Sequence, residues 1–162
     1  WDDAEGFYSL RFEKNMKEGM YRAHEVMEYD YADKKARYKS FTNKSEKVMD
    51  LPEHVKDQLS CIFFYRTMDV EIGKSNFIKV EADEKVYDLE VKALEYQNLS
   101  LPGLGSFDAV MVEPMAKFRG IFVRKGRLWI WMSADKRRIP LMMKTKIPIG
   151  SVICVLERIE QN

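Results

Sequence analysis

The amino-acid sequence predicts an all-β protein, a strongly curved antiparallel sheet or a partly open β-barrel, with one α-helix at about residues 51–67. Short apolar runs rich in Ile, Val, Phe and Trp recur along the chain, which is typical of strands. Gly, Pro and Asp separate these runs, as they do in turns between antiparallel strands. Only one stretch combines a helix start signal with helical spacing of its apolar residues. At 162 residues the chain fits a single domain, residues 1–162, long enough to bury a sizeable core.

Three short strands are predicted in the N-terminal part, at residues 7–12, 21–29 and 36–40. Apolar and polar residues alternate in the first of them, which is the period of a half-buried strand. The polar segment 15–19 ends in Gly19 and is predicted to be a turn. Strands with short turns between them make a meander.

The predicted helix starts at Asp50-Leu51-Pro52-Glu53. This segment places a carboxylate at the N-cap, Pro in the first turn and Glu at the third helical position, a capping-box arrangement. An apolar stripe at helical spacing follows, formed by Val55, Leu59, Ile62 and Phe63. We therefore expect Leu59 to face a core.

Strands are predicted again at 76–81, 86–93 and 107–113, with a break at Pro102-Gly103-Leu104-Gly105 before the last of them. The C-terminal part then contains four apolar runs separated by turn residues, at 118–123, 128–132, 139–143 and 152–156. They predict a closing antiparallel meander.

The run 128–132 is apolar on both sides, with Leu128, Ile130 and Met132 on one side and Trp129 and Trp131 on the other. A strand of this kind is covered on both faces. The sequence leaves open whether protein provides both covers or a ligand provides one of them.

Charge is divided unevenly along the chain, although the net charge is only +1. Residues 1–116 hold 16 Lys and Arg against 23 Asp and Glu, a balance of −7. Residues 117–146 hold 10 Lys and Arg against the lone Asp135, a balance of +9. This asymmetry indicates either an anionic partner or complementary outer faces of one sheet. The alternation of basic with apolar residues favours the second interpretation.

The two cysteines, Cys61 and Cys154, lie 93 positions apart, and no C-x-x-C or clustered His accompanies them. This excludes the usual zinc spacings. Each cysteine lies in an apolar run, where Cys behaves as a small hydrophobic residue, so buried free thiols are favoured over a disulfide. We predict no metal, no cofactor and no catalytic residue.

No apolar run reaches the roughly 18 residues that a membrane-spanning helix needs. The chain begins with WDDAEG instead of Met and has no signal peptide pattern. It is therefore expected to be a processed or trimmed form, and the removal of an export signal stays open. The segment Ile72-Gly73-Lys74-Ser75 lacks the first glycine of a phosphate-binding loop, because Met68 stands there, and is predicted to be a turn.

The segment SADKRRIP, residues 133–140, carries the most chemical information. It places Lys136, Arg137 and Arg138 at a predicted hairpin tip beneath Trp129 and Trp131. Arginine binds phosphate, carboxylate or sulfate, and tryptophan rings stack on sugars or contact lipid headgroups. The alternative, which we favour, is a solvated turn whose charges prevent aggregation between strands. Nucleic acid is not a predicted partner, because the rest of the chain is acidic.

Several segments together resemble the bacterial exported family known as domain of unknown function 3108 (DUF3108). They are DLPEHVKDQLSCIFFYR at 50–66, LPGLGSFDAVMVEP at 101–114, FVRKGRLWIWMSADKRRIP at 122–140 and KIPIGSVICVL at 146–156. The most specific part is the pattern W-x-S-x-D-x-R-R-x-P, here Trp131, Ser133, Asp135, Arg137, Arg138 and Pro140. The resemblance covers roughly residues 20–157.

The resemblance implies a secreted protein of Gram-negative bacteria, in the periplasm or facing the outer membrane. It also implies a curved all-β half-barrel with a helix, and it supplies no activity, cofactor or catalytic residue. Members of the family carry further strands before the first strand of this chain, so N-terminal strands of the family are expected to be missing here.

The first functional hypothesis is an exported, non-enzymatic domain of the cell envelope that binds a lipid, a glycan or another envelope component through its concave sheet. Its candidate contact residues are Trp129, Trp131, Lys136, Arg137 and Arg138. The alternative is a structural or scaffold protein that pairs with an envelope partner through exposed strands. A third hypothesis, which no residue pattern favours, is a hydrolase with paired carboxylates, Glu25 with Glu28 or Asp88 with Glu90.

Overall fold

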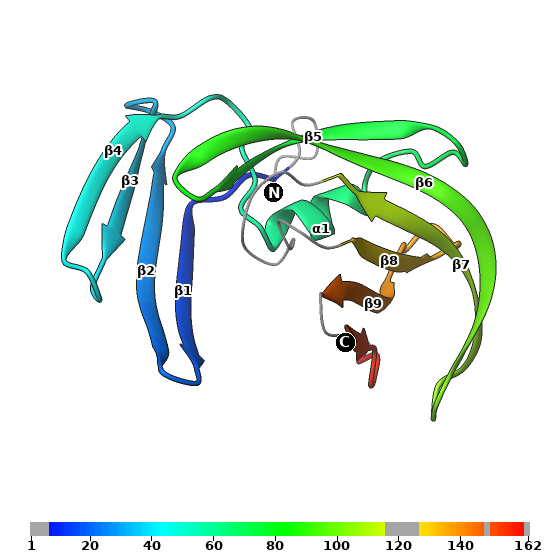
Figure 1. The fold of residues 1–162 in the computed structure, drawn as a ribbon. Coiled ribbons are helices and arrows are strands. Elements are labelled where there is room, and N and C mark those ends of the chain that lie inside the picture. Colours follow the sequence, from blue (N-terminus) through cyan, green and yellow to red (C-terminus); the bar gives the residue numbers. More distant parts are fainter. Residues whose placement is uncertain (1–6, 116–126, 148–149, 161–162) are drawn as a thin grey trace. The chain divides into compact units, whose positions relative to one another are not determined.

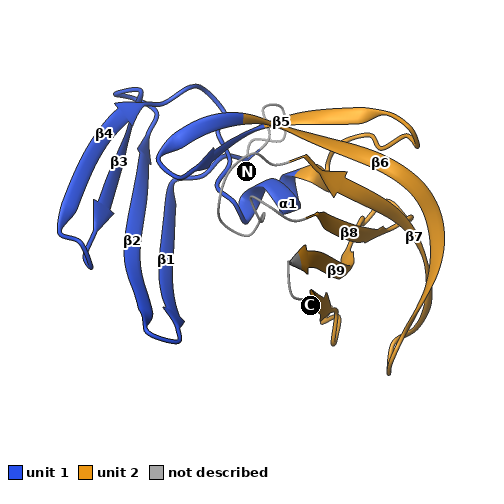
Figure 2. Cartoon of the chain, viewed as in Figure 1, with its two compact units in different colours: residues 1–64, 79–87 blue, residues 65–78, 88–162 orange. Residues whose placement is uncertain are grey.

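The computed structural model describes residues 7–115, 127–147 and 150–160, and it consists of two compact units (Figure 2). Unit 1 comprises residues 1–64 and 79–87, and unit 2 comprises residues 65–78 and 88–162. The chain therefore passes from one unit to the other more than once, and it does so inside strands as well as at the end of the helix. The single domain 1–162 stays a prediction.

Unit 1 contains a four-stranded antiparallel meander in the order β1-β2-β3-β4 (Figure 1). Its strands are β1 (Arg11–Glu18), β2 (Tyr21–Asp30), β3 (Lys35–Ser40) and β4 (Ser45–Asp50). The strands predicted at 21–29 and 36–40 are confirmed. The turns that follow β1, β2 and β3 contain residues with positive φ, Gly19 at 55°, Lys34 at 52° and Lys44 at 54°.

The sequence placed the first strand too early and missed the fourth. Residues 15–18, predicted to be a turn, belong to β1 and pair with β2. Strand β4 is exposed along most of its length and so has no hydrophobic period to reveal it. Main-chain pairing with β3 and two directly opposed ion pairs hold it, Lys35 with Asp50 at 2.6 Å and Lys39 with Glu46 at 2.8 Å.

The helix is much shorter than predicted, because α1 spans only Ser60–Tyr65. His54 has a left-handed φ of 58°, and Lys56 is extended and forms a parallel bridge to Val80. The N-cap is Asp57, whose Oδ1 accepts hydrogen bonds from the N–H groups of Leu59 and Ser60. Leu59 is 52% exposed, so the expectation that it faces a core is wrong.

A second antiparallel sheet has the strand order β10-β9-β8-β7-β6-β5. Its strands are β5 (Ser75–Ala82), β6 (Lys85–Leu101), β7 (Gly105–Pro114), β8 (Leu128–Ser133), β9 (Pro140–Ile147) and β10 (Gly150–Val155). The predicted strands at 76–81, 107–113 and 128–132 are confirmed. Strand β6 extends eight residues beyond the predicted end at 93, through a β-bulge between Ala93 and Glu95. The predicted strand at 118–123 lies outside the described residues.

The fold class is confirmed: strands dominate the described residues, in two antiparallel sheets with a single short helix. These residues form no closed barrel, and the strong curvature of β7 and of the part of β6 in unit 2 fits the predicted curved sheet (Figure 1).

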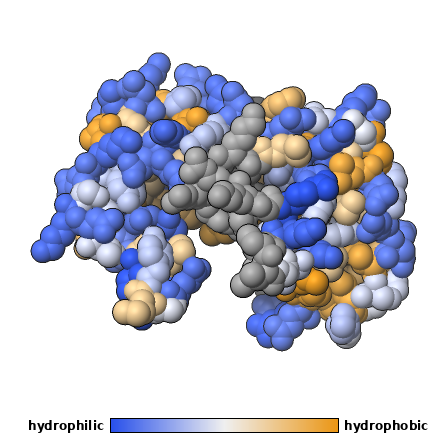
Figure 3. Space-filling model, viewed as in Figure 1, coloured by the Kyte–Doolittle hydropathy of each residue, from blue (hydrophilic) through white to orange (hydrophobic). Residues whose placement is uncertain are grey.

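Each unit has its own hydrophobic core. The core of unit 1 is formed by Met27, Tyr29, Ala36, Leu51 and Val55. Unit 2 contains a core cluster of Leu101, Ala109, Trp131 and Leu141. Hydrophobic side chains also reach the surface of the molecule, among hydrophilic ones (Figure 3).

Candidate functional site

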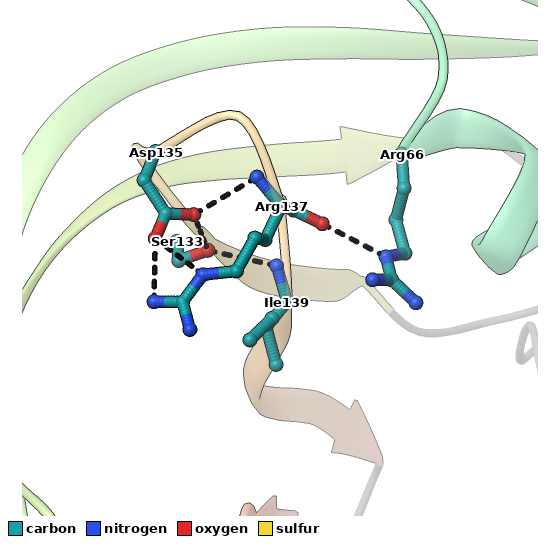
Figure 4. Close-up of polar contacts among 5 residues, drawn as sticks. All are labelled: Arg66, Ser133, Asp135, Arg137 and Ile139. Atoms are coloured by element: carbon teal, nitrogen blue, oxygen red, sulfur yellow. Dashed lines mark hydrogen bonds and ion pairs between the residues drawn. The ribbon is translucent and has the colours of Figure 1, made fainter. Parts of the chain in front are cut away.

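The turn between β8 and β9 is built around the side chains of Ser133 and Asp135 (Figure 4). The Ser133 hydroxyl accepts a hydrogen bond from the N–H of Ile139 and donates one to Asp135 Oδ1, both at 2.8 Å. The same Oδ1 atom accepts the N–H of Arg137 at 3.1 Å. These side chains satisfy main-chain groups that leave the β-ladder at this turn, so they fix its conformation.

Arg137 folds back on the carboxylate of Asp135. Its Nε donates to Oδ2 at 2.8 Å, and its Nη2 lies 2.6 Å from the same oxygen. Chiefly the hydrogen bond from Arg137, with a smaller contribution from Ser133, holds the pKa of Asp135 below its usual range. The two side chains are 52% and 45% exposed, so the guanidinium is paired with a carboxylate and still open to solvent.

Arg66 connects the segment after α1 to this turn. Its Nε donates to the main-chain oxygen of Arg137 at 2.9 Å (Figure 4). In return, Nη1 of Arg138 donates to the main-chain oxygen of Arg66 at 3.0 Å, and Nη2 of Arg138 lies 4.0 Å from Asp69 Oδ1. Arg138, with a φ of 44° and a side chain only 25% exposed, therefore holds the turn in place.

The side chains of Lys136 and Tyr65 differ from their neighbours in having no polar partner among the described residues. Lys136 is exposed at the tip of the turn and forms no ion pair within the described part of the chain. Tyr65 is 3% exposed, and its hydroxyl has no hydrogen-bond partner among the described residues. Burial raises the pKa of Tyr65 to about 12, against a smaller opposite effect of Arg138. A buried hydroxyl without a partner is a place where a water or a ligand oxygen is favoured.

Trp131 is a core residue. It is 6% exposed and packs in the core of unit 2, and its Nε1 donates to Gln97 Oε1 at 2.7 Å. The donor that an indole offers to a ligand is therefore already used, and its ring is covered by protein.

Trp129 is only partly buried, and the guanidinium of Arg127 lies 4.7 Å from the centre of its ring. Arg127 also forms a bidentate ion pair with Glu113, at 2.6 Å and 2.7 Å. Arg127 precedes β8 and the turn with Arg137 follows it. The structure thus places Trp129 at one end of the strand and the basic turn at the other, instead of bringing all five predicted residues into one cluster.

The carboxylate pairs of the hydrolase hypothesis differ in their placement. Glu25 and Glu28 are three residues apart in β2 and so point to opposite faces of the sheet. Asp88 and Glu90 are two residues apart in β6 and share a face, and Glu90 accepts a hydrogen bond from the Ser75 hydroxyl at 2.7 Å.

A buried polar cluster in unit 1 was not expected from the sequence. Asp57 Oδ2 accepts the Ser9 hydroxyl at 2.6 Å, and the Asp57 N–H donates to Ser9 Oγ at 2.7 Å and to Ser60 Oγ at 2.9 Å. With Asp57 also capping α1, this cluster joins residues far apart in the sequence and positions the helix.

Glu81 is 4% exposed in the same unit. It accepts the Tyr29 hydroxyl at 3.0 Å and the N–H of Glu84 at 3.0 Å. Burial nevertheless raises the pKa of Glu81 to about 7, because two hydrogen bonds do not replace full hydration of a carboxylate.

Lys56 is 1% exposed. Its Nζ donates to the main-chain oxygen of His54 at 2.7 Å and lies 4.1 Å from the centre of the Phe64 ring. Burial lowers the pKa of the Lys56 amine to about 8. Within the described residues no carboxylate forms an ion pair with it, so the cation is stabilised only by a carbonyl and a π face.

Both cysteines are free thiols, as predicted. Cys61 is buried, but Cys154 lies on the exposed strand β10, so the expectation that it is buried is wrong. Burial raises the pKa of the Cys61 thiol to about 12. The described residues contain no group of three or more His, Cys, Asp and Glu side chains that could hold a metal ion.

The sequence matches the model of the family described as "Protein of unknown function (DUF3108)" over residues 1–157. The chain belongs to the DUF3108 family. The resemblance drawn from the sequence is confirmed and extends further towards the N-terminus than residues 20–157. No curated protein and no solved structure matches the chain.

The structure explains the pattern W-x-S-x-D-x-R-R-x-P, which is the most specific part of the DUF3108 resemblance. Ser133, Asp135 and Arg137 hold the turn to itself, and Arg138 joins it to the segment after α1. Trp131 fills the core. These residues therefore have structural roles in this DUF3108 chain, and among the basic residues of the motif segment Lys136 is the most available to a partner.

Sequence reasoning missed Arg66, Lys56 and Glu81 as members of a site. Arg66 was visible as the Arg that ends the first segment of the DUF3108 resemblance. Nothing marked Lys56 and Glu81, because a charged residue in a predicted helix or in an alternating strand is ordinarily solvated. In the described part of this DUF3108 chain, no helix has both the length and the apolar composition to cross a membrane.

Proposed function

We propose that this DUF3108 protein is a non-enzymatic, exported domain of the cell envelope that binds an anionic lipid or glycan component through the turn between β8 and β9. The observation that carries the proposal is the exposed pair Lys136 and Arg137 on a turn whose main chain is fixed by Asp135. The Arg137 side chain is held by Asp135, so it binds an anion with less loss of conformational entropy than a mobile side chain.

The surrounding charge supports an anionic ligand. In the described segment 127–146, which contains the turn, six Lys and Arg residues stand against the single acidic residue Asp135, and such an excess favours anions. The unpartnered hydroxyl of Tyr65 adds a buried donor in the same unit as Arg138. Phosphate and carboxylate groups of envelope lipids and glycans have the matching chemistry.

The absence of an enzymatic role is part of the proposal. Ser133 is 4% exposed, and its hydroxyl makes hydrogen bonds with Asp135 and Ile139. A serine used in this way holds a turn and offers no accessible nucleophile. Export is supported by the family resemblance, and fractionation of cells that produce the full-length protein tests it.

Binding to vesicles tests the ligand proposal. We expect the chain to bind vesicles that contain anionic phospholipid or lipopolysaccharide and to bind neutral phosphatidylcholine vesicles weakly. Replacing both Lys136 and Arg137 with Gln should reduce binding by roughly fivefold per charge, since a basic residue near an anionic surface contributes ~1 kcal/mol.

The matched control replaces two exposed basic residues of unit 1, Lys39 and Lys47, with Gln. Equal binding of the two double variants to anionic vesicles would contradict the proposal. So would a wild type that binds anionic vesicles and anionic glycans no better than neutral vesicles.

A second candidate function, a scaffold that pairs with an envelope partner through an exposed strand, is favoured by β10. This strand lies at the edge of the six-stranded sheet, and all six of its residues are exposed. An edge strand of this kind is a template for strand addition.

A further inference from the structure

Among the described residues, strand β10 is an unprotected edge. Its six residues, Gly150 to Val155, carry no charge, and Val152, Ile153 and Val155 are 49%, 53% and 46% exposed. Alternate residues of a strand point to opposite faces, so apolar side chains are exposed on both faces of the sheet edge. Natural edge strands are ordinarily blunted by charge, Pro or a bulge.

The other edges of the described sheets have such protection. Strands β1 and β4 carry charged side chains along their length, among them Lys14, Lys17, Glu46 and Lys47. The main chain of β5 is partly covered, because the N–H of Lys56 donates to the Lys79 oxygen and the N–H of Glu81 donates to the Lys56 oxygen. Strand β10 therefore stands out as the edge open to pairing.

We propose that β10 pairs in antiparallel orientation with β10 of a second copy of the chain, an inference that rests on the second candidate function, strand pairing. A two-fold axis perpendicular to the sheet relates such strands, so opposed residues must lie on the same face. Centring the axis on Cys154 meets this condition. Ile153 then lies opposite Val155 of the partner, and Ser151 lies opposite Glu157.

Charge complementarity favours a second copy in this register. Within the chain Ser151 is paired with Lys146 of β9. Glu157 of one copy therefore lies in the same cross-strand row as Lys146 of the partner, with Ser151 of the partner between them. Their long side chains can meet across this serine, and the symmetry forms the arrangement twice. Both side chains are exposed, and neither has an ion-pair partner among the described residues. A single pair of edge strands is a small interface, so the dimer is weak.

Sedimentation velocity of the 162-residue chain over a concentration series is the first test. The wild type is expected to shift from monomer to dimer as concentration rises. Ile153→Lys, which places a charge on the edge, abolishes the shift. Val48→Lys is the matched control, because Val48 is 59% exposed on the edge strand β4, outside the proposed interface. The Val48→Lys variant is expected to form the dimer like the wild type.

Charge reversal tests the register. Glu157→Lys should weaken the dimer by up to about fivefold for each of the two symmetric contacts, and addition of Lys146→Glu should restore it. A double variant as weak as the single variant overturns this register.

Mild oxidation provides a readout that does not depend on a variant that folds. Cys154 is exposed and faces its counterpart in the proposed dimer, whereas Cys61 is 2% exposed. The wild type is expected to form a disulfide-linked dimer that Cys154→Ser abolishes. A chain that is monomeric at every concentration and forms no such disulfide overturns self-pairing.

Retention of the chain in the envelope fraction distinguishes a failure of the self-pairing proposal from a failure of the proposed scaffold function. If a monomeric wild type is retained and Ile153→Lys alone loses retention, self-pairing is overturned and strand pairing with another protein stands. If the wild type is monomeric and Ile153→Lys and Val48→Lys are retained equally, both self-pairing and the scaffold function are overturned.

Discussion

Arg66 and Arg137, two cations 71 positions apart, are joined by a hydrogen bond of 2.9 Å from Nε of Arg66 to the main-chain oxygen of Arg137. The contact uses a carbonyl as acceptor, so it avoids the repulsion that two facing guanidinium groups would create. It fixes the position of the turn between β8 and β9 relative to the segment after α1, both within unit 2.

Replacing Arg66 with Ala should therefore lower the free energy of unfolding by about 1 kcal/mol, the net contribution of one hydrogen bond. Amide exchange of the turn residues should accelerate, because the main chain loses an anchor. Hydrogen exchange and urea unfolding measure the two effects. Arg37→Ala is the control, since Arg37 makes only exposed ion pairs, at 3.2 Å and 3.6 Å. An unchanged rate of amide exchange in the turn of the Arg66→Ala variant would contradict the anchoring role of Arg66.

Glu81 makes the stability of unit 1 depend on pH. Its folded-state pKa of about 7 lies above the ordinary value of 4.5, so the folded state binds more protons between these values. The contribution of Glu81 to stability is fully present below pH 4.5 and is lost as pH rises through 7, a change of about 3 kcal/mol. Glu81→Gln should remove this slope, as measured by urea unfolding at several pH values. Glu46→Gln, in an exposed pair with Lys39, should keep it. Parallel curves for the wild type and Glu81→Gln would refute the assignment.

Lys56 acts in the alkaline range and with the opposite sign. Its folded-state pKa of about 8 lies below 10.5, so the folded state binds fewer protons between pH 8 and 10.5, and stability rises over that range. Lys56→Met keeps the apolar stem and removes the titrating group. We expect its stability to stay constant where that of the wild type rises, with Lys47→Met, an exposed lysine, behaving like the wild type. A rise that survives in Lys56→Met would point to another group.

A substitution of Trp131 should lower the free energy of unfolding and leave vesicle binding unchanged. Trp131→Phe removes the donor to Gln97 and leaves the Gln97 oxygen without it, at a cost of about 1–3 kcal/mol. The double variant with Gln97→Leu should recover part of this loss, because both polar partners are then absent. Urea unfolding and vesicle binding are measured together. A folded Trp131→Phe variant with reduced binding would show that the ring contacts the ligand.

The strand content was predictable because much of it follows local rules. Strand β8 was recognisable from its unbroken apolar run, and β2 and β3 from their turns. The charged strand β4 was not, since its main-chain pairing with β3 holds a segment that has no apolar period.

The helix start misled for a physical reason. Asp50 precedes Pro52 in the way an N-cap does, but its carboxylate pairs with Lys35 across the sheet at 2.6 Å. Lys56 then forms an extended, parallel bridge to Val80, so the main chain at this position cannot be helical. Local capping signals cannot reveal a partner 24 residues away, so the actual cap at Asp57 was hidden.

The residues of the candidate site were predictable from the sequence, but the role of each residue was not. The sequence located the basic turn and its arginines, but the roles of Arg137 and Arg138 depend on acceptors in the folded chain, the carboxylate of Asp135 and the main-chain oxygen of Arg66. Of the basic residues of this turn, only Lys136 is exposed and without an ion-pair partner in the described part of the chain, as its sequence context indicated.

The division of unit 1 between residues 1–64 and 79–87 limits where the protein can be cut. A fragment that stops at residue 64 would lack the acceptor of the Tyr29 hydroxyl and the main-chain partners of Lys56, both of which residues 79–81 supply. Such a fragment would expose polar groups that the intact chain keeps satisfied. Proteases and gene truncations should therefore yield stable pieces of this protein only when the hairpin of β5 and β6 is retained.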